Sequence, residues 1–252
     1  MNHPTLEKLS QLRLRGMSSA FEEFLQQNIT LSFEEGLSWL VEREFVLRDN
    51  LRLKRRLQQA KLKQSACVEN INFKKTRGLQ KSFILQLSEG NWIKQHLNLL
   101  ITGPTGTGKT YLACALSHKA CLQNYTVRYY RVPRLLQELL VARADGSYPK
   151  LLTQISKAQI LILDDWALAP LNDEQRRDLL EIMDDRYQTA STIITSQLPI
   201  AHWHEYIADQ TLADAILDRL LHNSIKLSLS GDSLRKNENT VCQTEEEFSI
   251  IK

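Results

Sequence analysis

The feature that most constrains this fold is a glycine-rich loop between an apolar segment and an amphipathic one. Residues 103–110 read Gly-Pro-Thr-Gly-Thr-Gly-Lys-Thr and match the pattern G-x-x-x-x-G-K-[ST] at every position. The apolar segment 97–102 predicts a buried strand before the loop, and segment 109–123 predicts a helix after it. This order indicates a phosphate-binding loop, because the glycines let backbone N–H groups turn toward an anion without interference from a Cβ atom.

The loop also predicts how a nucleotide and its metal ion are held. The helix after the loop directs the positive end of its dipole at the phosphates. We expect Lys109 to reach the β- and γ-phosphates as a point charge, and the Thr110 hydroxyl to ligate Mg²⁺. The nucleotide-binding candidates are Gly103, Pro104, Thr105, Gly106, Thr107, Gly108, Lys109, Thr110 and Tyr111.

Short apolar runs alternate with helical segments in the rest of the chain. This alternation predicts an α/β fold in which helices cover both faces of a parallel sheet. The further predicted strands are 126–132, 159–164, 191–196 and 225–229, and the further predicted helices are 133–144, 173–187 and 211–222. Twenty-three residues follow the last of these strands. We expect no full helical lid domain there, so that a neighbouring subunit closes over the nucleotide.

Polar residues follow two of these predicted strands. In open α/β sheets the carboxyl ends of the strands form the crevice where ligands bind. We therefore expect Asp164 to hold Mg²⁺ and Asp165 to orient or deprotonate the attacking water. We expect Gln197, or Ser196 beside it, to hydrogen-bond the γ-phosphate or that water. In both places the alternative is a strand that simply ends in turn residues.

The N-terminal part of the chain differs from the rest in pattern and charge. Residues 5–63 carry apolar side chains at helical spacing and predict a small all-α domain. From Arg43 to Lys81, twelve basic and three acidic residues give a net charge of +9, in a chain whose net charge is +3. This asymmetry favours a polyanion partner, with a solvated helix face as the alternative. Phosphate contacts carry no base preference, so we expect non-specific binding to duplex DNA. The candidate contacts are Arg52, Arg55, Arg56, Lys74, Lys75 and Arg77.

Three other kinds of protein are disfavoured by the sequence. No apolar run approaches the ~18 residues that a membrane helix needs. The N-terminus, MNHPTLEKLS, has no apolar core after a basic start, so we expect no secretory signal and a cytoplasmic protein without membrane contact. The cysteines form no C-x-x-C pair, which argues against a zinc site or a disulfide framework.

Seven segments of the chain carry a resemblance to a known family. They are GPTGTGKTYLACAL, YYRVPRLLQEL, ARADGSYPKLL, ILILDDWALAPL, STIITSQLP, HWHEYI and LADAILDRLLHNS. Together they resemble the IstB-type transposition helper ATPases, AAA+ proteins that are encoded beside a transposase in bacterial insertion sequences and are similar to the DnaC helicase loaders. The resemblance extends from the N-terminus to about Arg235. It implies an AAA+ core that hydrolyses ATP with Mg²⁺, forms a homo-oligomer on duplex DNA largely without sequence preference, and stimulates a partner transposase.

The resemblance also implies roles for single residues. Lys109 and Thr110 match the Walker A positions, and Asp164 matches the Walker B metal ligand. Asp165 stands where the class often has a catalytic Glu, and Gln197 falls at the expected sensor 1 position.

Two arginines resemble family residues that act from outside the loop. Arg219 resembles the arginine finger offered to a neighbouring subunit's ATP, with a surface ion pair to Asp214 or Asp218 as the alternative. Arg235 resembles the sensor 2 arginine of the loader group. Initiator-type AAA+ proteins also contact DNA near the segment that corresponds to 131–150. The candidates there are Arg134, Arg143 and Lys150.

These observations predict four parts of the chain: a helical N-terminal domain for DNA binding and assembly, a basic linker that leads into the core, an AAA+ ATPase domain and a flexible tail. Their predicted bounds are 1–66, 67–96, 97–236 and 237–252. The expected protein is an ATPase whose subunits join through the ATP site on duplex DNA and assist a transposase. A DnaC-like replicative helicase loader is the main alternative. A P-loop kinase for a small molecule is the third, and it needs an acceptor pocket and usually a closing lid, neither of which the sequence indicates.

Overall fold

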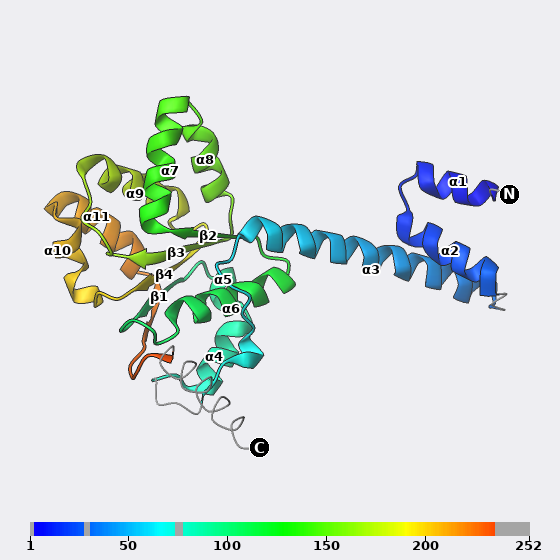
Figure 1. The fold of residues 1–252 in the computed structure, drawn as a ribbon, viewed down its shortest axis with the longest axis horizontal. Helices are drawn as coiled ribbons and strands as arrows, with labels where there is room; N and C mark the ends of the chain where they lie inside the picture. The colour runs from blue at the N-terminus through cyan, green and yellow to red at the C-terminus, as the bar shows by residue number, and fades with distance from the viewer. Residues whose placement is uncertain (1–2, 28–30, 74–77, 235–252) are drawn as a thin grey trace, which may run out of the picture. The chain divides into compact units, whose positions relative to one another are not determined.

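The chain divides into two compact units, residues 1–58 and 59–252. The computed structural model describes residues 3–27, 31–73 and 78–234 (Figure 1). The boundary between the units falls inside one long helix, α3 (Phe33–Ala60), which carries the polypeptide from the first unit into the second.

Three helices build the described part of the N-terminal unit, which is the all-α architecture that the apolar spacing predicts. They are α1 (Pro4–Gln11), α2 (Arg15–Gln27) and α3. Helix α2 approaches α3 closely at Gly16, where a Cβ atom would lie 2.6 Å from the Arg43 carbonyl oxygen. The buried Glu44 carboxylate accepts a hydrogen bond from the Gly16 backbone N–H at 2.6 Å and pairs with Arg48 at 2.6 Å. A glycine and a buried acid therefore determine where these two helices meet.

A five-stranded parallel sheet forms the centre of the second unit. Its strands are β1 (Asn98–Thr102), β2 (Val127–Arg131), β3 (Ile160–Trp166), β4 (Ser191–Ser196) and β5 (Ser224–Ser228). Their order across the sheet is β2-β3-β4-β1-β5, and every neighbouring pair is parallel. The predicted α/β fold with a parallel sheet is confirmed. Strands β1 and β4 are buried along their whole length, which explains why their apolar residues are consecutive and do not alternate with polar ones.

Helices cover both faces of this sheet (Figure 1). One face carries α4 (Lys81–Ser88), α5 (Asn91–Lys94) and α6 (Lys109–Leu122), and the other carries α7 (Val132–Asp145), α8 (Tyr148–Ser156), α9 (Asp173–Arg186), α10 (Trp203–Ile207) and α11 (Gln210–Leu221). Two short 3-10 helices are η1 (Val68–Asn70) and η2 (Ile200–His202). Helices α4 and α5 lie within 67–96, where the sequence predicts a linker. Buried Ile84, Leu87 and Trp92 attach this range to the core.

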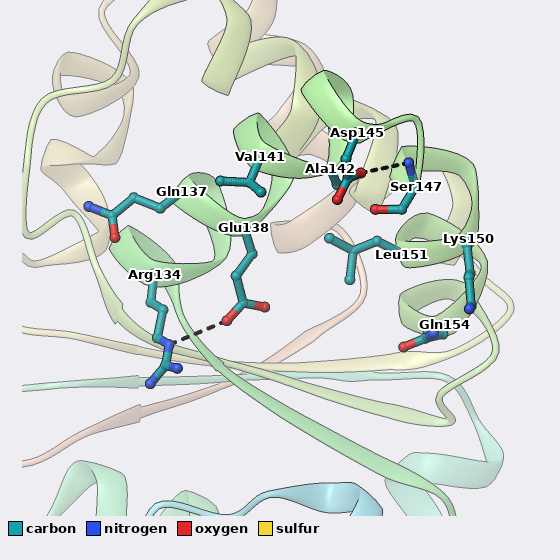
Figure 2. Close-up of a pocket in the computed structure, with 10 residues that line it drawn as sticks. All are labelled: Arg134, Gln137, Glu138, Val141, Ala142, Asp145, Ser147, Lys150, Leu151 and Gln154. Atoms are coloured by element: carbon teal, nitrogen blue, oxygen red, sulfur yellow. Dashed lines mark hydrogen bonds and ion pairs between the residues drawn. The ribbon is translucent and has the colours of Figure 1, made fainter.

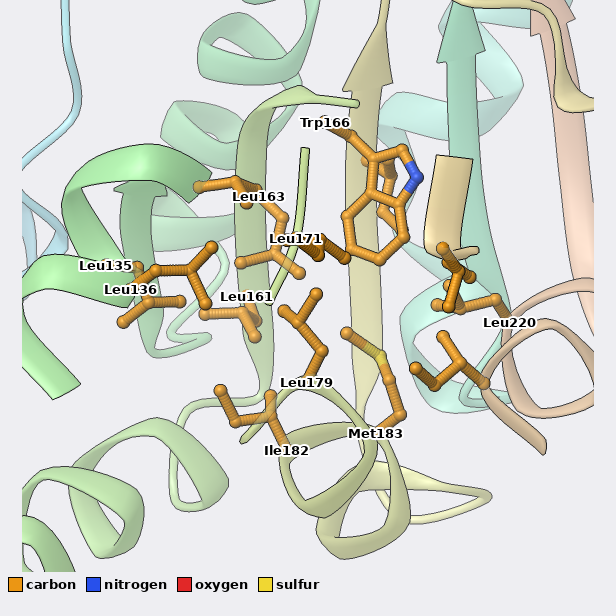
Figure 3. Close-up of a cluster of buried hydrophobic side chains, with 14 of the residues drawn as sticks. Leu135, Leu136, Leu161, Leu163, Trp166, Leu171, Leu179, Ile182, Met183 and Leu220 are labelled. Carbon is orange, nitrogen blue, oxygen red and sulfur yellow. The ribbon is translucent and has the colours of Figure 1, made fainter. Parts of the chain in front are cut away.

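A hydrophobic core lies between the sheet and helices α7 to α11 (Figure 3). Leu161 and Leu163 of β3 pack in one cluster with Leu179, Ile182 and Met183 of α9, and each of these side chains is at most 3 % exposed. Burying such side chains is the main source of stability in a domain of this kind. The core therefore holds the strand ends, and the polar residues on them, in place.

The carboxyl ends of β3, β4 and β1 lie side by side because these strands are neighbours in the sheet. The register pairs Leu163 of β3 with Ile194 of β4, and Thr102 of β1 with Ser196 of β4. The pairing of β3 with β4 becomes irregular after Leu163, and Asp165 there has a left-handed φ of 60°. This edge of the sheet thus brings the loop after β1 together with the polar residues that end β3 and β4.

Candidate nucleotide-binding site

The phosphate loop connects β1 to α6 at the carboxyl edge of the sheet. Gly103 has a φ of 147°, and a Cβ atom there would lie 2.3 Å from the Leu229 carbonyl oxygen, so no larger residue fits. Gly108 has a φ of 93° directly before α6, whose N-terminus opens onto the loop. The Lys109 Nζ atom donates to the carbonyl oxygens of Gly103 and Pro104 at 2.7 and 2.8 Å. The loop thus combines a helix N-terminus with a lysine charge, which is the combination that binds phosphate.

Two other predicted nucleotide-binding residues have hydroxyl partners within the chain, and one of them, Tyr111, also lines a cavity beside the loop. Thr107 is fully buried, and its hydroxyl donates to the Pro104 carbonyl oxygen at 2.9 Å. The Tyr111 hydroxyl donates to the Cys67 carbonyl oxygen at 3.3 Å. Both side chains therefore support the shape of the loop and of the segment beside it.

Asp164 is a fully buried acid at the end of β3. Its Oδ1 accepts hydrogen bonds from Thr110 Oγ1 at 2.8 Å and from Thr195 Oγ1 at 2.5 Å. Its Oδ2 accepts from the Tyr129 hydroxyl at 2.6 Å and lies 3.4 Å from Lys63 Nζ. Burial by itself raises the pKa of this carboxyl, but the hydroxyl donors and the charge of Lys63 outweigh burial and hold the pKa below its usual value. Asp164 is therefore ionised in neutral solution.

The pair formed by Thr110 and Asp164 fits a magnesium ion. Mg²⁺ prefers oxygen ligands, and it is commonly held by one or two protein side chains together with the phosphates of a substrate. Here a hydroxyl and an ionised carboxylate lie 2.8 Å apart beside the loop. Tyr129 does not compete as a ligand, because burial and the Asp164 carboxylate raise the pKa of its phenol and keep it a neutral donor.

Asp165 and Gln197 both line a cavity beside the loop. The Oδ2 atom of Asp165 pairs with Arg131 Nε at 2.6 Å, and its backbone N–H donates to Thr195 Oγ1 at 3.3 Å. The Gln197 Oε1 atom accepts a hydrogen bond from Thr105 Oγ1 of the phosphate loop at 2.7 Å. The two residues thus lie where the sequence predicts them, and each has a partner that the sequence did not indicate.

This cavity measures about 490 Å³, a volume that suits a small-molecule ligand. Among the described residues, three cations line it, Lys63, Lys109 and Arg131, against one lining carboxylate, Asp165. A surplus of positive charge beside a phosphate loop favours a polyphosphate ligand.

Several side chains of this site were not predicted as parts of it, among them Lys63, Tyr129, Arg131 and Thr195. Tyr129 and Arg131 are two positions apart on β2, so they point to the same face of the sheet. Ligands bind at the carboxyl ends of parallel strands, and Tyr129 and Arg131 lie at that end of β2. Their position in the predicted strand was therefore a signal that could have identified both residues. Lys63 follows a helix in a different part of the chain, and no local pattern marks it.

Arg219 lies in the last turn of α11 and is held within its own chain. Its Nε pairs with a carboxylate oxygen of Asp184 on α9, and its Nη1 donates to the Ala215 carbonyl oxygen at 2.7 Å. The alternative of a surface ion pair is thus correct in kind, but the partner is Asp184 rather than Asp214 or Asp218.

Arg219 also lies near the edge of the sheet opposite the phosphate loop. It borders a small hollow together with Asn98, the first residue of β1, whereas the phosphate loop follows the last residue of that strand. Arg219 is therefore remote from the phosphate loop of its own chain. Arg235 lies outside the described residues.

The basic residues proposed to contact DNA in the N-terminal half are only partly described. Arg52 and Arg55 are exposed on α3, and Arg56 is half-buried on the same helix. The candidates Lys74, Lys75 and Arg77 lie outside the described residues.

Of the second group, Arg134 and Lys150 are exposed beside a hollow between α7 and α8 (Figure 2). Arg134 Nε pairs with Glu138 on the same helix at 3.3 Å. Exposed pairs of this kind contribute little stability and exchange readily, so both cations remain accessible to an anionic partner.

Arg143 has a different environment from those two. It pairs with Asp178 and, at 3.2 Å, with Glu174, and its guanidinium lies 3.8 Å from the centre of the Tyr148 ring. The hydrogen bond to Asp178 raises the pKa of this arginine. Arg143 thus joins α7 to α9, and its charge is already balanced within the fold.

The fold and the site together define an α/β protein with a P-loop nucleotide site. The structure is similar to that of DnaI, with a TM-score of 0.56 and 20 % identity over 65 % of this chain and 90 % of that one. It is also similar to the DnaC helicase loader, with a TM-score of 0.53 and 20 % identity over 65 % of this chain and 96 % of that one. AMPPCP-bound DnaA from Aquifex aeolicus gives a TM-score of 0.57 at 18 % identity, over 73 % of this chain and 57 % of that one.

The family follows from the sequence comparison. A family model described as IstB-like ATP binding protein matches residues 7–242, and the chain belongs to this family. An insertion-sequence ATP-binding protein of Sinorhizobium fredii is 50 % identical over 94 % of this chain and 97 % of its own length. One from Pseudomonas fluorescens is 51 % identical over 79 % of this chain and 87 % of its own length. The part of the chain that the structure describes contains no helix with the length and apolar character to span a membrane.

Proposed function

We propose that this protein is an Mg²⁺-dependent ATPase that assembles on duplex DNA in its ATP-bound state and assists the transposase of an insertion sequence. The observation that carries the proposal is the 2.8 Å hydrogen bond of Thr110 to the buried Asp164, beside the loop that holds Lys109. Membership of a family whose relatives are named insertion-sequence ATP-binding proteins supports the biological setting.

The residues of the site divide the work of phosphoryl transfer. Lys109 exchanges the loop carbonyls for the β- and γ-phosphate oxygens, because a charged acceptor makes the stronger hydrogen bond. Thr110 and Asp164 would hold Mg²⁺, which when bound neutralises the charge that develops on the phosphate oxygens. These three side chains bind and orient the triphosphate, and activation of the attacking water requires other residues of the cavity.

Asp165 and Gln197 act on the attacking water in this proposal. Gln197 orients the water, and Asp165 accepts the proton that the water loses. The water oxygen bonds to the γ-phosphorus while the bond from that phosphorus to the β–γ bridging oxygen breaks, which yields ADP and inorganic phosphate. The Asp165 carboxylate is paired with Arg131 at 2.6 Å, so that ion pair must open before the proton is accepted.

Assembly through the ATP site assigns a role to Arg219. Its place near the amino edge of the sheet keeps it away from the phosphate loop of its own chain, so its target is the ATP of an adjacent copy. To reach that ATP, Arg219 exchanges Asp184 for the more highly charged phosphates. An arginine supplied in trans speeds phosphoryl transfer by about 10³–10⁵-fold.

Duplex DNA is bound through phosphates in this proposal, along surfaces that repeat from one subunit to the next. Arg52 and Arg55 of α3, and Arg134 and Lys150 beside the hollow of Figure 2, are exposed cations with no base-reading pattern. Many such contacts in an oligomer can offset the roughly 1–6 kcal/mol needed to bend a short site.

The variant Lys109→Ala tests the link between nucleotide and assembly. We expect it to lose ATP binding in equilibrium titration and, together with it, the large assemblies that light scattering detects with ATP and duplex. Lys119→Ala is the matched control, because Lys119 lies on the same helix and pairs with Glu69 outside the cavity. Normal assembly of Lys109→Ala would refute the proposal.

A replicative helicase loader is the second candidate function, favoured by the similarity of the fold to DnaI and DnaC. At 20 % identity that similarity concerns the fold alone. A pull-down with the ATP-loaded protein distinguishes the two, since a helper retains the transposase encoded beside it and a loader retains the replicative helicase.

A further inference from the structure

Lys63 brings a positive charge into the phosphate site from outside the phosphate-loop motif. It is the third residue after the end of α3, and its Nζ lies 3.4 Å from Asp164 Oδ2. The side chain lines the same cavity as Lys109 and is 43 % exposed. It therefore reaches a fully buried acid from the solvent side of the cavity.

The segment that carries Lys63 is attached to the ATPase core on both sides of this residue. Before it, the Gln59 carbonyl oxygen accepts a hydrogen bond from Arg128 Nη1 of β2 at 2.7 Å, and Ala60 is fully buried. The backbone of Lys63 and Gln64 lies beside the Cys114 thiol on α6 and acts to lower the pKa of that thiol, against the larger effect of burial. Lys63 thus has a defined place relative to both β2 and the helix that begins at the phosphate loop.

This place has a chemical consequence for Asp164. A buried carboxylate needs a compensating positive charge, and in a loaded P-loop site that charge comes from the divalent metal. The Lys63 ammonium lies at ion-pair distance from the very carboxylate that would hold the metal. Either the Lys63 ammonium or a metal ion can thus compensate the negative charge of Asp164.

We propose that Lys63 stands in for the metal ion at Asp164 and so lets the site bind a nucleoside triphosphate without Mg²⁺. Without a cation at Asp164, the incoming phosphates meet an uncompensated negative charge in a buried setting. With Lys63 present, that repulsion is cancelled before any metal arrives. The proposal rests on the proposed function only in taking this cavity as the ATP site.

The proposal predicts that Lys63 matters most when the metal is absent. Lys63→Met keeps the aliphatic stem and removes the charge. In excess Mg²⁺ the metal compensates Asp164, so affinity falls by no more than about threefold. With EDTA, affinity falls by at least about tenfold relative to the unaltered protein, which corresponds to about 1.4 kcal/mol.

Two further variants separate this role from general effects of charge. Lys61→Met makes the same change two residues earlier, at an exposed position that does not line the cavity, and we expect wild-type affinity in both buffers. Lys63→Arg keeps the positive charge, and we expect it to restore binding in EDTA.

The experiment is an equilibrium titration of the full chain with a fluorescent ATP analogue, once in excess MgCl₂ and once in EDTA. Equal losses for Lys63→Met in both buffers, or no loss in EDTA, would overturn the role of Lys63. Absence of binding by the unaltered protein in EDTA alone would overturn it too. Absence of binding in both buffers would instead overturn the proposed ATP site and, with it, this inference.

Discussion

Replacing Tyr129 by Phe removes a single hydroxyl that stabilises the buried acid of the site. The Tyr129 hydroxyl donates to Asp164 Oδ2 at 2.6 Å, and Asp164 is 0 % exposed. Without this donor, the ionised Asp164 carboxylate loses one hydrogen bond, and no water replaces it because the side chain is fully buried. Hydrogen bonds to charged groups contribute about 1.5–3 kcal/mol. We therefore expect the free energy of unfolding of the second unit to fall by about that amount at pH 7.

Urea unfolding followed by tryptophan fluorescence measures this change, because Trp166 and Trp203 are buried in the same unit. Tyr130→Phe is the matched control, since the neighbouring Tyr130 packs against the hydrophobic cluster instead of Asp164. We expect a loss of less than about 0.5 kcal/mol for the control. Equal losses in the two variants would refute the assignment of the energy to the Asp164 hydrogen bond.

The effect of Tyr129→Phe also has a predicted pH dependence. The pKa of Asp164 is held below its usual value in the folded protein, so its ionised form stabilises the fold above the unfolded pKa of about 3.9. This stabilisation is lost as the pH falls through the lowered folded pKa. The difference between Tyr129→Phe and wild type should thus shrink in urea titrations below about pH 4. A difference that stays constant from pH 7 to the lowest pH at which the fold persists would contradict this reasoning.

Three further substitutions test the fold in single measurements. Gly16→Ala places a Cβ 2.6 Å from the Arg43 carbonyl oxygen, so we expect the N-terminal unit to lose about 1–3 kcal/mol in thermal unfolding followed by circular dichroism. Asp184→Asn breaks the half-exposed ion pair with Arg219, and it should lower the free energy of unfolding in urea by at most about 1 kcal/mol. Ala167 has a left-handed φ of 62°. Ala167→Gly should therefore raise the free energy of unfolding in urea by up to about 1 kcal/mol.

The sheet could be predicted from the sequence because each strand is a short local segment, and β1, β3 and β4 are almost entirely buried. The runs 126–132 and 191–196 correspond to β2 and β4 within a residue at each end. Helices α8 and α10 were not predicted, since both are short and gain their stability from packing and not from local signals. Leu152 and Ile155 of α8, for example, are buried against the rest of the fold.

Some residues of the candidate site could be predicted from local sequence motifs, whereas others come together only in the folded chain. Thr110 and Asp164 each belong to a contiguous motif, and the strand that carries each motif could be read directly. Their 2.8 Å hydrogen bond, and the approach of Tyr129, depend on the order β2-β3-β4-β1, which periodicity does not reveal. Lys63 is more distant still, because it reaches Asp164 across 101 positions of the chain.

The backbone at the end of β3 gives a physical reason for the shorter acid at position 165. Asp165 has a φ of 60°, a left-handed conformation in which Asp is several-fold enriched among residues with a side chain, because its short polar group can hydrogen-bond locally. A Glu at this position gains no such compensation. The shorter side chain also forms the 2.6 Å ion pair with Arg131, which keeps the carboxylate occupied until that pair opens. Under the proposed function, this ion pair delays the proton transfer from the attacking water to Asp165 and so slows hydrolysis.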